Sequence, residues 1–264
     1  MLNLKPMRNL TIILSMALAV STAQARGLKK IKQPIPAPAF TTESILVADF
    51  DGNVVTEKEG NIVRPIASIS KLMVALLASE QDQEERLEIP KVRTVQTSIP
   101  RNVPKLTREE LMTLALVRSD NFAAQILCNN IDRCVERMNE RAAEIGMTNT
   151  HYNEPTGLDR GNVSTATDLL KLLLVTTMNP IVTRISSMAK AEIPLDKTSI
   201  KIHNTNPLTA KLDVILSKTG FTNPAGGCLV MAVNSPVGQR ILILLGSRNA
   251  KTRIPDMERI YKGL

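Results

Sequence analysis

Three short motifs in the sequence carry residues that could perform acyl transfer. In the first, Ser68 and Lys71 stand three positions apart at the start of an apolar segment, residues 69–77, whose pattern predicts a buried helix. Residues at i and i+3 share one face of a helix, so the lysine amine can reach the serine hydroxyl. A lysine in a dry site loses its proton more readily and can then accept the serine proton near neutral pH. The spacing therefore predicts a serine nucleophile with a lysine general base.

The second motif is Ser119-Asp120-Asn121, between two predicted helices. The Ser119 hydroxyl could relay a proton to a leaving amine, and the Asn121 amide could hold a backbone carbonyl of a substrate. A simple helix cap is the alternative interpretation of the same three residues.

The third motif is Lys218-Thr219-Gly220, at the end of a predicted strand. Lys218 and Thr219 could together bind a substrate carboxylate, and Gly220 would let a substrate backbone come close. An ordinary strand end followed by a turn glycine is the alternative here.

Each motif is weak alone, because the chain contains decoys. Ser187 and Lys190 repeat the first spacing, and Ser247 and Asn249 repeat the second. The decoys fail on order, since the first follows the S-x-N motif and the second follows the K-T-G motif. The ordered set, on a helix start, an inter-helix turn and a strand end, favours a catalytic site.

This ordered set resembles that of the penicillin-recognising serine enzymes, and the chain is similar to the D-alanyl-D-alanine peptidases from about residue 44 to its end. The most specific similarity is the run VILSKTGFTN at residues 214–223, followed by AG at 225–226 and CLV at 228–230. That run resembles the D-alanyl-D-alanine endopeptidase branch. One departure is Asp120, because many carboxypeptidases of the family have S-G-N and serine β-lactamases have S-D-N.

The resemblance implies a role for each motif residue. It makes Ser68 the acylated nucleophile, Lys71 the general base and Ser119 the proton relay. It assigns substrate binding to Asn121, Lys218, Thr219 and Gly220, and an oxyanion hole to the N–H groups of Ser68 and Phe221. The implied partners are peptidoglycan stem peptides and cross-links, with β-lactams as inhibitors. The implied activity is hydrolysis of D-alanine-containing bonds, as a carboxypeptidase, an endopeptidase or both.

Two alternatives stay beside this hypothesis. A class A-like β-lactamase needs E-x-x-L-N, but after Glu154 the leucine comes one place late, at Leu158, and Asp159 follows it instead of asparagine. A non-catalytic protein that binds penicillin or cell-wall peptide would be expected to have lost one of the motif residues, and none is lost.

The hydrophobic pattern predicts an α+β fold. Strands are expected at 44–49 and 54–56, as an N-terminal hairpin, and at 214–218, 227–234 and 240–246. Helices are expected at 69–77, 107–116, 122–128, 132–145, 166–177 and 253–262, with a capping box at Thr107 and Glu110 and an N-terminus at Ser164 or Thr165. We expect strands from both chain ends to share one antiparallel sheet flanked by helices, with a helical lobe of about residues 80–190 inserted between them. The resemblance implies the same serine β-lactamase/transpeptidase-like fold.

Composition and charge exclude several other classes. The chain of 264 residues is 43% apolar, which is ordinary for a globular protein. It has six Phe and Tyr residues and no Trp, which argues against single-stranded nucleic acid or sugar as a partner. The net charge of +8 accompanies no nucleic-acid-binding motif and suits peripheral association with the cell wall or a membrane surface. The two histidines stand far apart and no Cys/His cluster has metal-ligand spacing, so we expect neither a metal nor a cofactor.

The N-terminus predicts export to the periplasm. Lys5 and Arg8 precede an apolar run at 10–20, and residues 23–25 (AQA) form an A-x-A site, so residues 1–25 are expected to be a signal peptide cleaved after Ala25. An uncleaved anchor is the alternative. An extended leader (26–43) and a single peptidase domain (44–264) are expected to follow.

Three cysteines remain in the expected mature chain. Cys128 and Cys134 flank a predicted turn between two helices, where a disulfide and two free thiols are equally compatible with the sequence. Cys228 lies in a predicted buried strand, where a free, inert thiol is expected.

Overall fold

The computed structural model describes residues 40–264. The predicted signal peptide and most of the predicted leader lie outside these residues.

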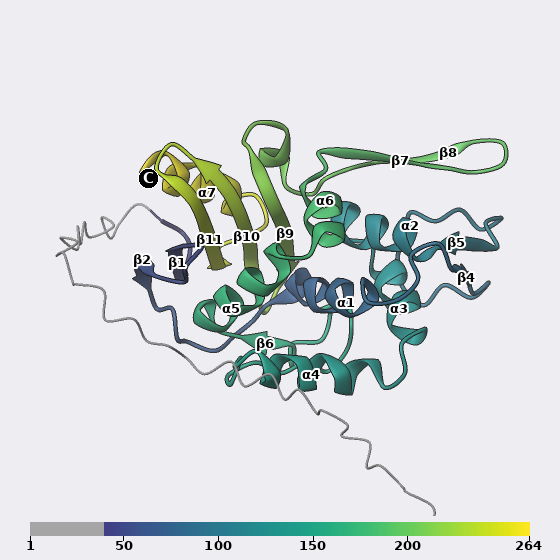
Figure 1. Ribbon diagram of the computed structural model, residues 1–264, viewed down its shortest axis with the longest axis horizontal. Coiled ribbons are helices and arrows are strands. Elements are labelled where there is room, and N and C mark those ends of the chain that lie inside the picture. The colour runs from purple at the N-terminus through teal and green to yellow at the C-terminus, as the bar shows by residue number, and fades with distance from the viewer. Residues whose placement is uncertain (1–39) are drawn as a thin grey trace, which may run out of the picture. The chain divides into compact units, whose positions relative to one another are not determined.

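A five-stranded antiparallel sheet joins the two ends of the described chain, in the order β2-β1-β11-β10-β9 (Figure 1). Its strands are β1 (Ser44–Asp49), β2 (Val54–Lys58), β9 (Val214–Thr222), β10 (Gly226–Ser235) and β11 (Gly238–Ser247). The first strand pairs with the last along its whole length, from Ser44 opposite Leu245 to Asp49 opposite Arg240. The predicted sheet built from N- and C-terminal strands is therefore confirmed.

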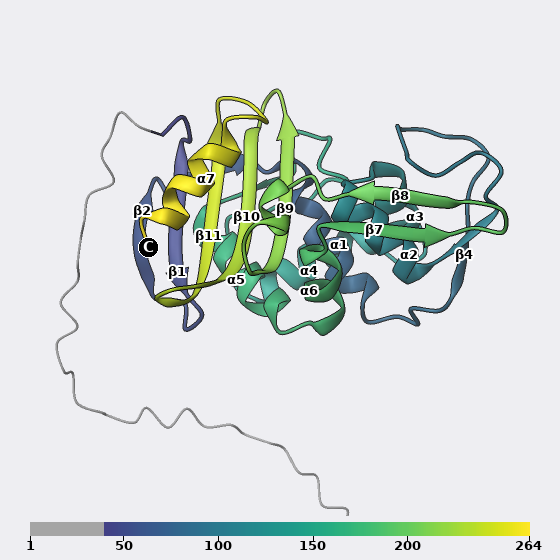
Figure 2. The same cartoon turned by 90° about the horizontal axis from the view of Figure 1, so that it is seen from above.

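Alternating side chains give the sheet two apolar faces, as a strand periodicity of two requires. Leu46 and Ala48 of β1 belong to the core shared with the helical lobe, whereas Ile45 and Val47 belong to a second core on the opposite face. That opposite face is covered by α7 (Arg253–Lys262), which crosses the strands in Figure 2. The sheet is thus the middle layer between α7 and the other helices.

The larger helices between β2 and β9 form the lobe, and one short helix, η3 (Pro207–Ala210), instead joins the second core on the α7 side through Leu208. The helices of the lobe are η1 (Ala67–Ser70), α1 (Lys71–Ala78), α2 (Arg108–Thr113), η2 (Leu114–Arg118), α3 (Asn121–Asn129), α4 (Cys134–Glu144), α5 (Ala166–Thr177) and α6 (Pro180–Ser187). All eight residues of α1 are buried, as the apolar run at 69–77 predicts. Three short antiparallel pairs complete the fold: β3 (Arg64–Pro65) with β6 (Val163–Ser164), β4 (Arg86–Glu88) with β5 (Lys105–Thr107), and β7 (Lys190–Pro194) with β8 (Ser199–His203).

Local capping signals set where several helices begin. Thr107 and Glu110 form the predicted capping box of α2, and the Thr165 side chain accepts a hydrogen bond from Asp168 N at the start of α5. The helical conformation runs two residues beyond the predicted helix at 107–116, because α2 ends at Thr113 and continues to Arg118 as a π-helical turn, η2. Ser119 then takes a left-handed conformation (φ 61°), and Asp120 N donates to Leu114 O at 3.0 Å.

The β7–β8 hairpin was not predicted from the sequence. It extends away from the sheet beyond the helices (Figure 1), and its buried residues Ile193, Ile200 and Ile202 join the core of the lobe. Alternation is present but short: Ala191 and Ile193 face inward in the first strand, which ends at Pro194, and Ile200 and Ile202 face inward in the second.

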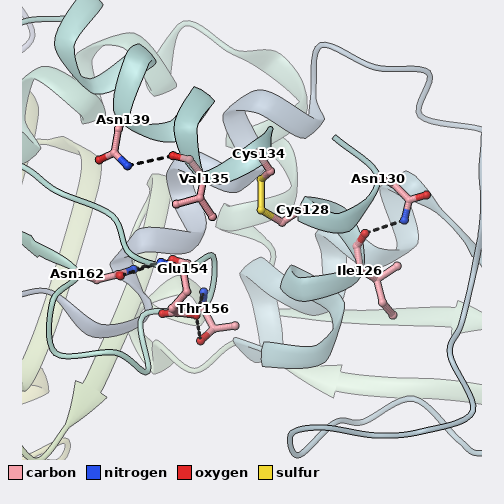
Figure 3. The surroundings of a disulfide bond; sticks show 9 residues. All are labelled: Ile126, Cys128, Asn130, Cys134, Val135, Asn139, Glu154, Thr156 and Asn162. Atoms are coloured by element: carbon pink, nitrogen blue, oxygen red, sulfur yellow. Dashed lines mark hydrogen bonds between the residues drawn. A yellow bond between two sulfur atoms is a disulfide. The ribbon is translucent and has the colours of Figure 1, made fainter. Parts of the chain in front are cut away.

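Cys128 and Cys134 form a disulfide that joins the end of α3 to the start of α4, with their Cα atoms 5.4 Å apart (Figure 3). The structure thus decides the alternative that the sequence left open. Cys228 is a free, buried cysteine of β10, and burial raises the pKa of its thiol to about 11, which keeps it protonated and unreactive at neutral pH.

Candidate active site

Ser68 lies in the turn of η1 that leads into the buried helix α1. The residue before it, Ala67, has a left-handed backbone (φ 48°), and the Ser70 hydroxyl donates to the Ala67 carbonyl at 2.9 Å. A non-glycine residue in this conformation is strained, and such strain tends to occur at functional sites where the surrounding structure holds it. We call Ile66–Ser70 the nucleophile turn.

Two glycines from distant segments pack directly against this turn. Gly157 has φ 82°, and a Cβ atom there would lie 2.7 Å from Ser68 N and overlap the Ala67 carbonyl. A Cβ atom on Gly220 of β9 would lie 2.9 Å from Ile66 O and 3.1 Å from Ser68 N. Both segments reach Ser68 only because these positions have no side chain.

Lys71 is the centre of the site's hydrogen bonding. Its Nζ donates to Ser68 Oγ at 2.8 Å, to Asn121 Oδ1 at 2.7 Å and to the carbonyl oxygen of Thr156 at 2.6 Å. Complete burial lowers the pKa of Lys71 to about 7, against the opposing effect of the Glu154 and Asp120 carboxylates. A large share of Lys71 is therefore the neutral amine at neutral pH, and that amine can accept the Ser68 proton.

The turn between η2 and α3 brings Ser119 and Asn121 to the same place. The Asp120 side chain caps α3 by accepting from Ala123 N at 3.1 Å, so the capping interpretation of the motif holds for its middle residue. The two residues on either side of this cap contact the two lysines of the other motifs: Asn121 contacts Lys71, and Ser119 contacts Lys218.

Lys218 reaches the site from β9. Its Nζ donates to Ser119 Oγ at 2.8 Å and to the carbonyl of Thr219 at 2.9 Å. Burial first, and then the positive charges of Lys71 and Arg253, lower the pKa of Lys218 well below its usual value. An anionic group is the ligand that such a buried amine lacks, because it would favour the charged form.

The three motifs thus form one hydrogen-bonded site, and comparisons with known proteins bear on its identity. A family model described as D-alanyl-D-alanine carboxypeptidase (Peptidase_S11) matches residues 31–249. The chain belongs to this family. Among its relatives is a D-alanyl-D-alanine endopeptidase of Escherichia coli, 33% identical over 84% of this chain and 77% of the relative. Another is a D-alanyl-D-alanine carboxypeptidase of Mycobacterium tuberculosis, 30% identical over 80% of this chain and 76% of the relative.

The fold agrees with that membership. Penicillin-binding protein D2 of Listeria monocytogenes, in its ampicillin-bound form, matches with a TM-score of 0.77 and 28% identity over 86% of this chain and 98% of that one. The fold is therefore the serine β-lactamase/transpeptidase-like α+β fold that the family resemblance implied.

The structure separates the decoy motifs from the family site. Ser187 ends α6 and Lys190 begins β7, so this pair shares no helix face. Ser247 is the last residue of β11, and it is joined to Thr42 by a hydrogen bond of 2.7 Å.

Some residues of the site escaped the sequence analysis. The Thr156 carbonyl is a main-chain group, so the residue type gives no hint of it. Asn162, which is fully buried, and Arg253, whose Nη1 donates to the Gly220 carbonyl at 2.6 Å, lie outside the three motifs. Gly157 was a visible signal only in the comparison with E-x-x-L-N, where it stands three residues after Glu154 and displaces the leucine by one place.

Two negative findings concern the described residues only. Within residues 40–264, no group of three or more His, Cys, Asp or Glu residues is arranged to hold a metal ion. In the same range no single helix is long and apolar enough to cross a membrane, although the bent pair α5–α6 meets the criteria of length and composition when taken together.

Proposed function

We propose that this protein is a serine D,D-peptidase that hydrolyses D-alanine-containing bonds of peptidoglycan peptides through an acyl-enzyme at Ser68, which penicillins also form. The observation that carries this proposal is the contact of 2.8 Å between the buried Lys71 amine and the Ser68 hydroxyl. A lysine whose pKa is lowered to about 7 is matched to work as a general base near neutral pH.

In the acylation step, Lys71 accepts the Ser68 proton while Oγ attacks the carbonyl carbon of the scissile bond. The leaving amine takes a proton from the Ser119 hydroxyl, and the proton that Lys71 gained replaces it, so Lys71 is a neutral amine again. Lys218 donates a hydrogen bond to Ser119 Oγ and keeps its own proton for binding the carboxylate. Water then hydrolyses the ester, which releases the shortened peptide and restores Ser68.

The groups proposed to bind substrate are those that are not already occupied by hydrogen bonds to Lys71 or Lys218. Asn121 presents Oδ1 to Lys71, so its amide N–H₂ group is the one that would hold a substrate carbonyl. Lys218 and Thr219 would bind the terminal carboxylate, and Ser68 N and Phe221 N would stabilise the oxyanion. Strand β9, which carries Lys218, Thr219 and Phe221, is the final strand of the sheet order, where an extended peptide can lie alongside.

The labelling of Ser68 tests this proposal. A labelled penicillin should modify the native protein at Ser68 and should not modify Ser68→Ala. Ser187→Ala is the matched control, because it removes the serine of the decoy motif with the same spacing, and it should label as the native protein does. Labelling that survives Ser68→Ala would refute the assignment.

The lifetime of the adduct separates a peptidase from a β-lactamase. The Glu154 carboxylate accepts hydrogen bonds from Thr156 N at 2.6 Å and from Gly157 N at 2.5 Å. These bonds stabilise the loop, and they occupy the carboxylate that a β-lactamase would use to activate a hydrolytic water. We therefore expect the penicilloyl adduct to persist for minutes or longer in intact-protein mass spectra after a penicillin pulse.

The relatives' names leave two substrates for this chain, a cross-link and an uncross-linked pentapeptide end. Digestion of cross-linked and uncross-linked muropeptides, followed by chromatography, would show which is cleaved faster. Export by a signal peptide cleaved after Ala25, a periplasmic location and peripheral association through the basic charge belong to the same proposal, and N-terminal sequencing of the exported protein tests the cleavage.

A further inference from the structure

The third partner of Lys71 is a main-chain carbonyl whose direction the structure controls closely. Thr156 O accepts from Lys71 Nζ at 2.6 Å, and Thr156 is fully buried. A backbone carbonyl can point elsewhere after a modest rotation of its peptide plane, so something must keep this one aimed at Lys71.

Glu154 holds that peptide plane from its opposite side. Thr156 O and Gly157 N belong to the same planar trans peptide, in which the carbonyl and the N–H point in opposite directions. Glu154 Oε1 accepts from Gly157 N at 2.5 Å, and Glu154 Oε2 accepts from Thr156 N and from Thr156 Oγ1, each at 2.6 Å. With the N–H fixed on the carboxylate, the carbonyl is directed at the lysine.

Asn162 ties Glu154 to the nucleophile turn. Its Oδ1 accepts from Glu154 N at 3.2 Å, and its Nδ2 donates to Glu154 O at 2.8 Å and to Ser70 Oγ at 2.9 Å. Its main-chain carbonyl also accepts from Ile66 N at 3.0 Å. Figure 3 shows the side chains of Asn162, Glu154 and Thr156 grouped in this loop. Glu154 is therefore held at a fixed place relative to Ser68.

We propose that Glu154 is a positioning residue for the general base: it orients the Thr156–Gly157 peptide so that Thr156 O holds the Lys71 amine against Ser68 Oγ. This inference rests on the proposed role of Lys71 as the base. It gives the glutamate a part in acylation, in contrast to the deacylation role of a β-lactamase glutamate.

The charge of Glu154 acts on Lys71 as well. The charged groups around the Lys71 amine are Glu154 on its loop, Asp120 on the turn before α3 and Lys218 on β9. Glu154 and Asp120 raise the pKa of Lys71 against the larger effect of burial. Removing the Glu154 charge should therefore lower that pKa below its value of about 7, and the rate of acylation should then reach half its maximum at a lower pH.

The test compares Glu154→Gln with the native protein and with Asp159→Asn, by measuring the second-order rate of penicillin acylation from pH 5 to 9. A glutamine side chain would have to place its N–H₂ group against one of the two N–H groups that now donate to the carboxylate. Two donors repel each other, so the Thr156–Gly157 peptide shifts. A misplacement of 1 Å near reacting groups can cost about 10²-fold in rate, so we expect a maximal rate that is about 10- to 100-fold lower. We expect the midpoint pH to fall at the same time.

Two further variants make the readout specific. Asp159→Asn removes a charge from the same loop at an exposed residue that holds Gly161 N rather than Thr156 or Gly157, and it should keep the native profile. Glu154→Asp keeps the charge but is too short to hold both N–H groups, so its maximal rate should fall while its midpoint stays near the native one. A fraction of unfolded protein lowers the maximal rate but cannot move the midpoint.

The results that would refute the role of Glu154 differ from those that would refute the proposed peptidase function. A native maximal rate in Glu154→Gln overturns the inference, and so does a lower rate with an unmoved midpoint. If Ser68 of the native protein is never acylated, the proposed function itself fails. If the native adduct clears rapidly and persists in Glu154→Gln, the protein is a β-lactamase and both proposals fail.

Discussion

Replacing Gly157 with alanine should separate the position of Ser68, the proposed nucleophile, from the stability of the fold. An alanine Cβ would lie 1.9 Å from Ala67 O, whereas Cβ atoms essentially never come closer than 3.0 Å to such an atom. The loop and the nucleophile turn must therefore move apart by about 1.1 Å, the difference between these two distances. A displacement of that size is worth about 10²-fold in rate, or about 2.7 kcal/mol of transition-state stabilisation.

Gly52→Ala is the matched control for this variant. Gly52 has the same φ of 82°, but its Cβ would meet only the Leu174 side chain, at 3.4 Å. Both variants should lose about 1–2 kcal/mol of unfolding free energy, because alanine is strained at positive φ. Gly157→Ala should lose about 1–3 kcal/mol more, because of its steric overlap with Ala67. Only Gly157→Ala should lose penicillin acylation.

The assay combines urea unfolding with the rate of acylation by a fluorescent penicillin, both at pH 8. Gly157→Ala acylating at the native rate would refute the reasoning. An equal loss of acylation in Gly52→Ala would also refute it, because backbone strain alone would then explain the effect.

Three further predictions concern other parts of the protein. Because burial lowers the pKa of Lys71 to about 7 and the neutral amine is the base, acylation at pH 6 should run at about one tenth of its rate at high pH, and a flat profile from pH 6 to 8 would contradict this. Lys218→Ala should slow acylation by peptide substrates with a free carboxylate far more than by amidated ones, and equal losses would refute carboxylate binding. Cys134→Ser opens the loop closed by the disulfide with Cys128, so the free energy of unfolding should fall by about 2 kcal/mol in urea titrations while acylation stays native, and an unchanged stability would contradict it.

The sequence predicts the fold well where apolar patterns are long. Strands β1, β10 and β11 and helices α1, α5 and α7 have sustained periodicity or clear caps, and each lies close to its predicted range. The structure departs from the predicted ranges where tertiary contacts outweigh the local conformational preference of the sequence. The apparently continuous helix ends in the π-helical turn η2, which the left-handed Ser119 follows. Strand β7 pairs with β8 along its whole length, and its Ile193 packs into the core of the lobe.

The residues of the site also divide into those that the sequence reveals and those that it does not. The motif residues were visible because their side-chain types suggest the chemistry, and their order distinguished Ser68 from Ser187. The Thr156 carbonyl was invisible because any residue supplies one, and its direction depends on Glu154 and Asn162. In the sequence, Glu154 suggests only a β-lactamase glutamate, and nothing marks Asn162. Only the structure shows that Asn162 holds Glu154, and that Glu154 holds the peptide whose carbonyl contacts Lys71.

The pairing of the first described strand with the last constrains when the protein can become active. Strand β1 is flanked by β2 and by β11, and its contacts with β11 join residues about 200 positions apart in the chain, for example Ser44 and Leu245. Contacts of such long sequence separation form slowly, because the entropy of closing the loop must be overcome first. A chain delivered with its N-terminus first, by synthesis or by translocation, therefore holds all three motifs before it can complete the sheet that aligns them. Reactivity toward penicillin should therefore emerge only after β11 has arrived, although the last of the three motifs, on β9, is made before it.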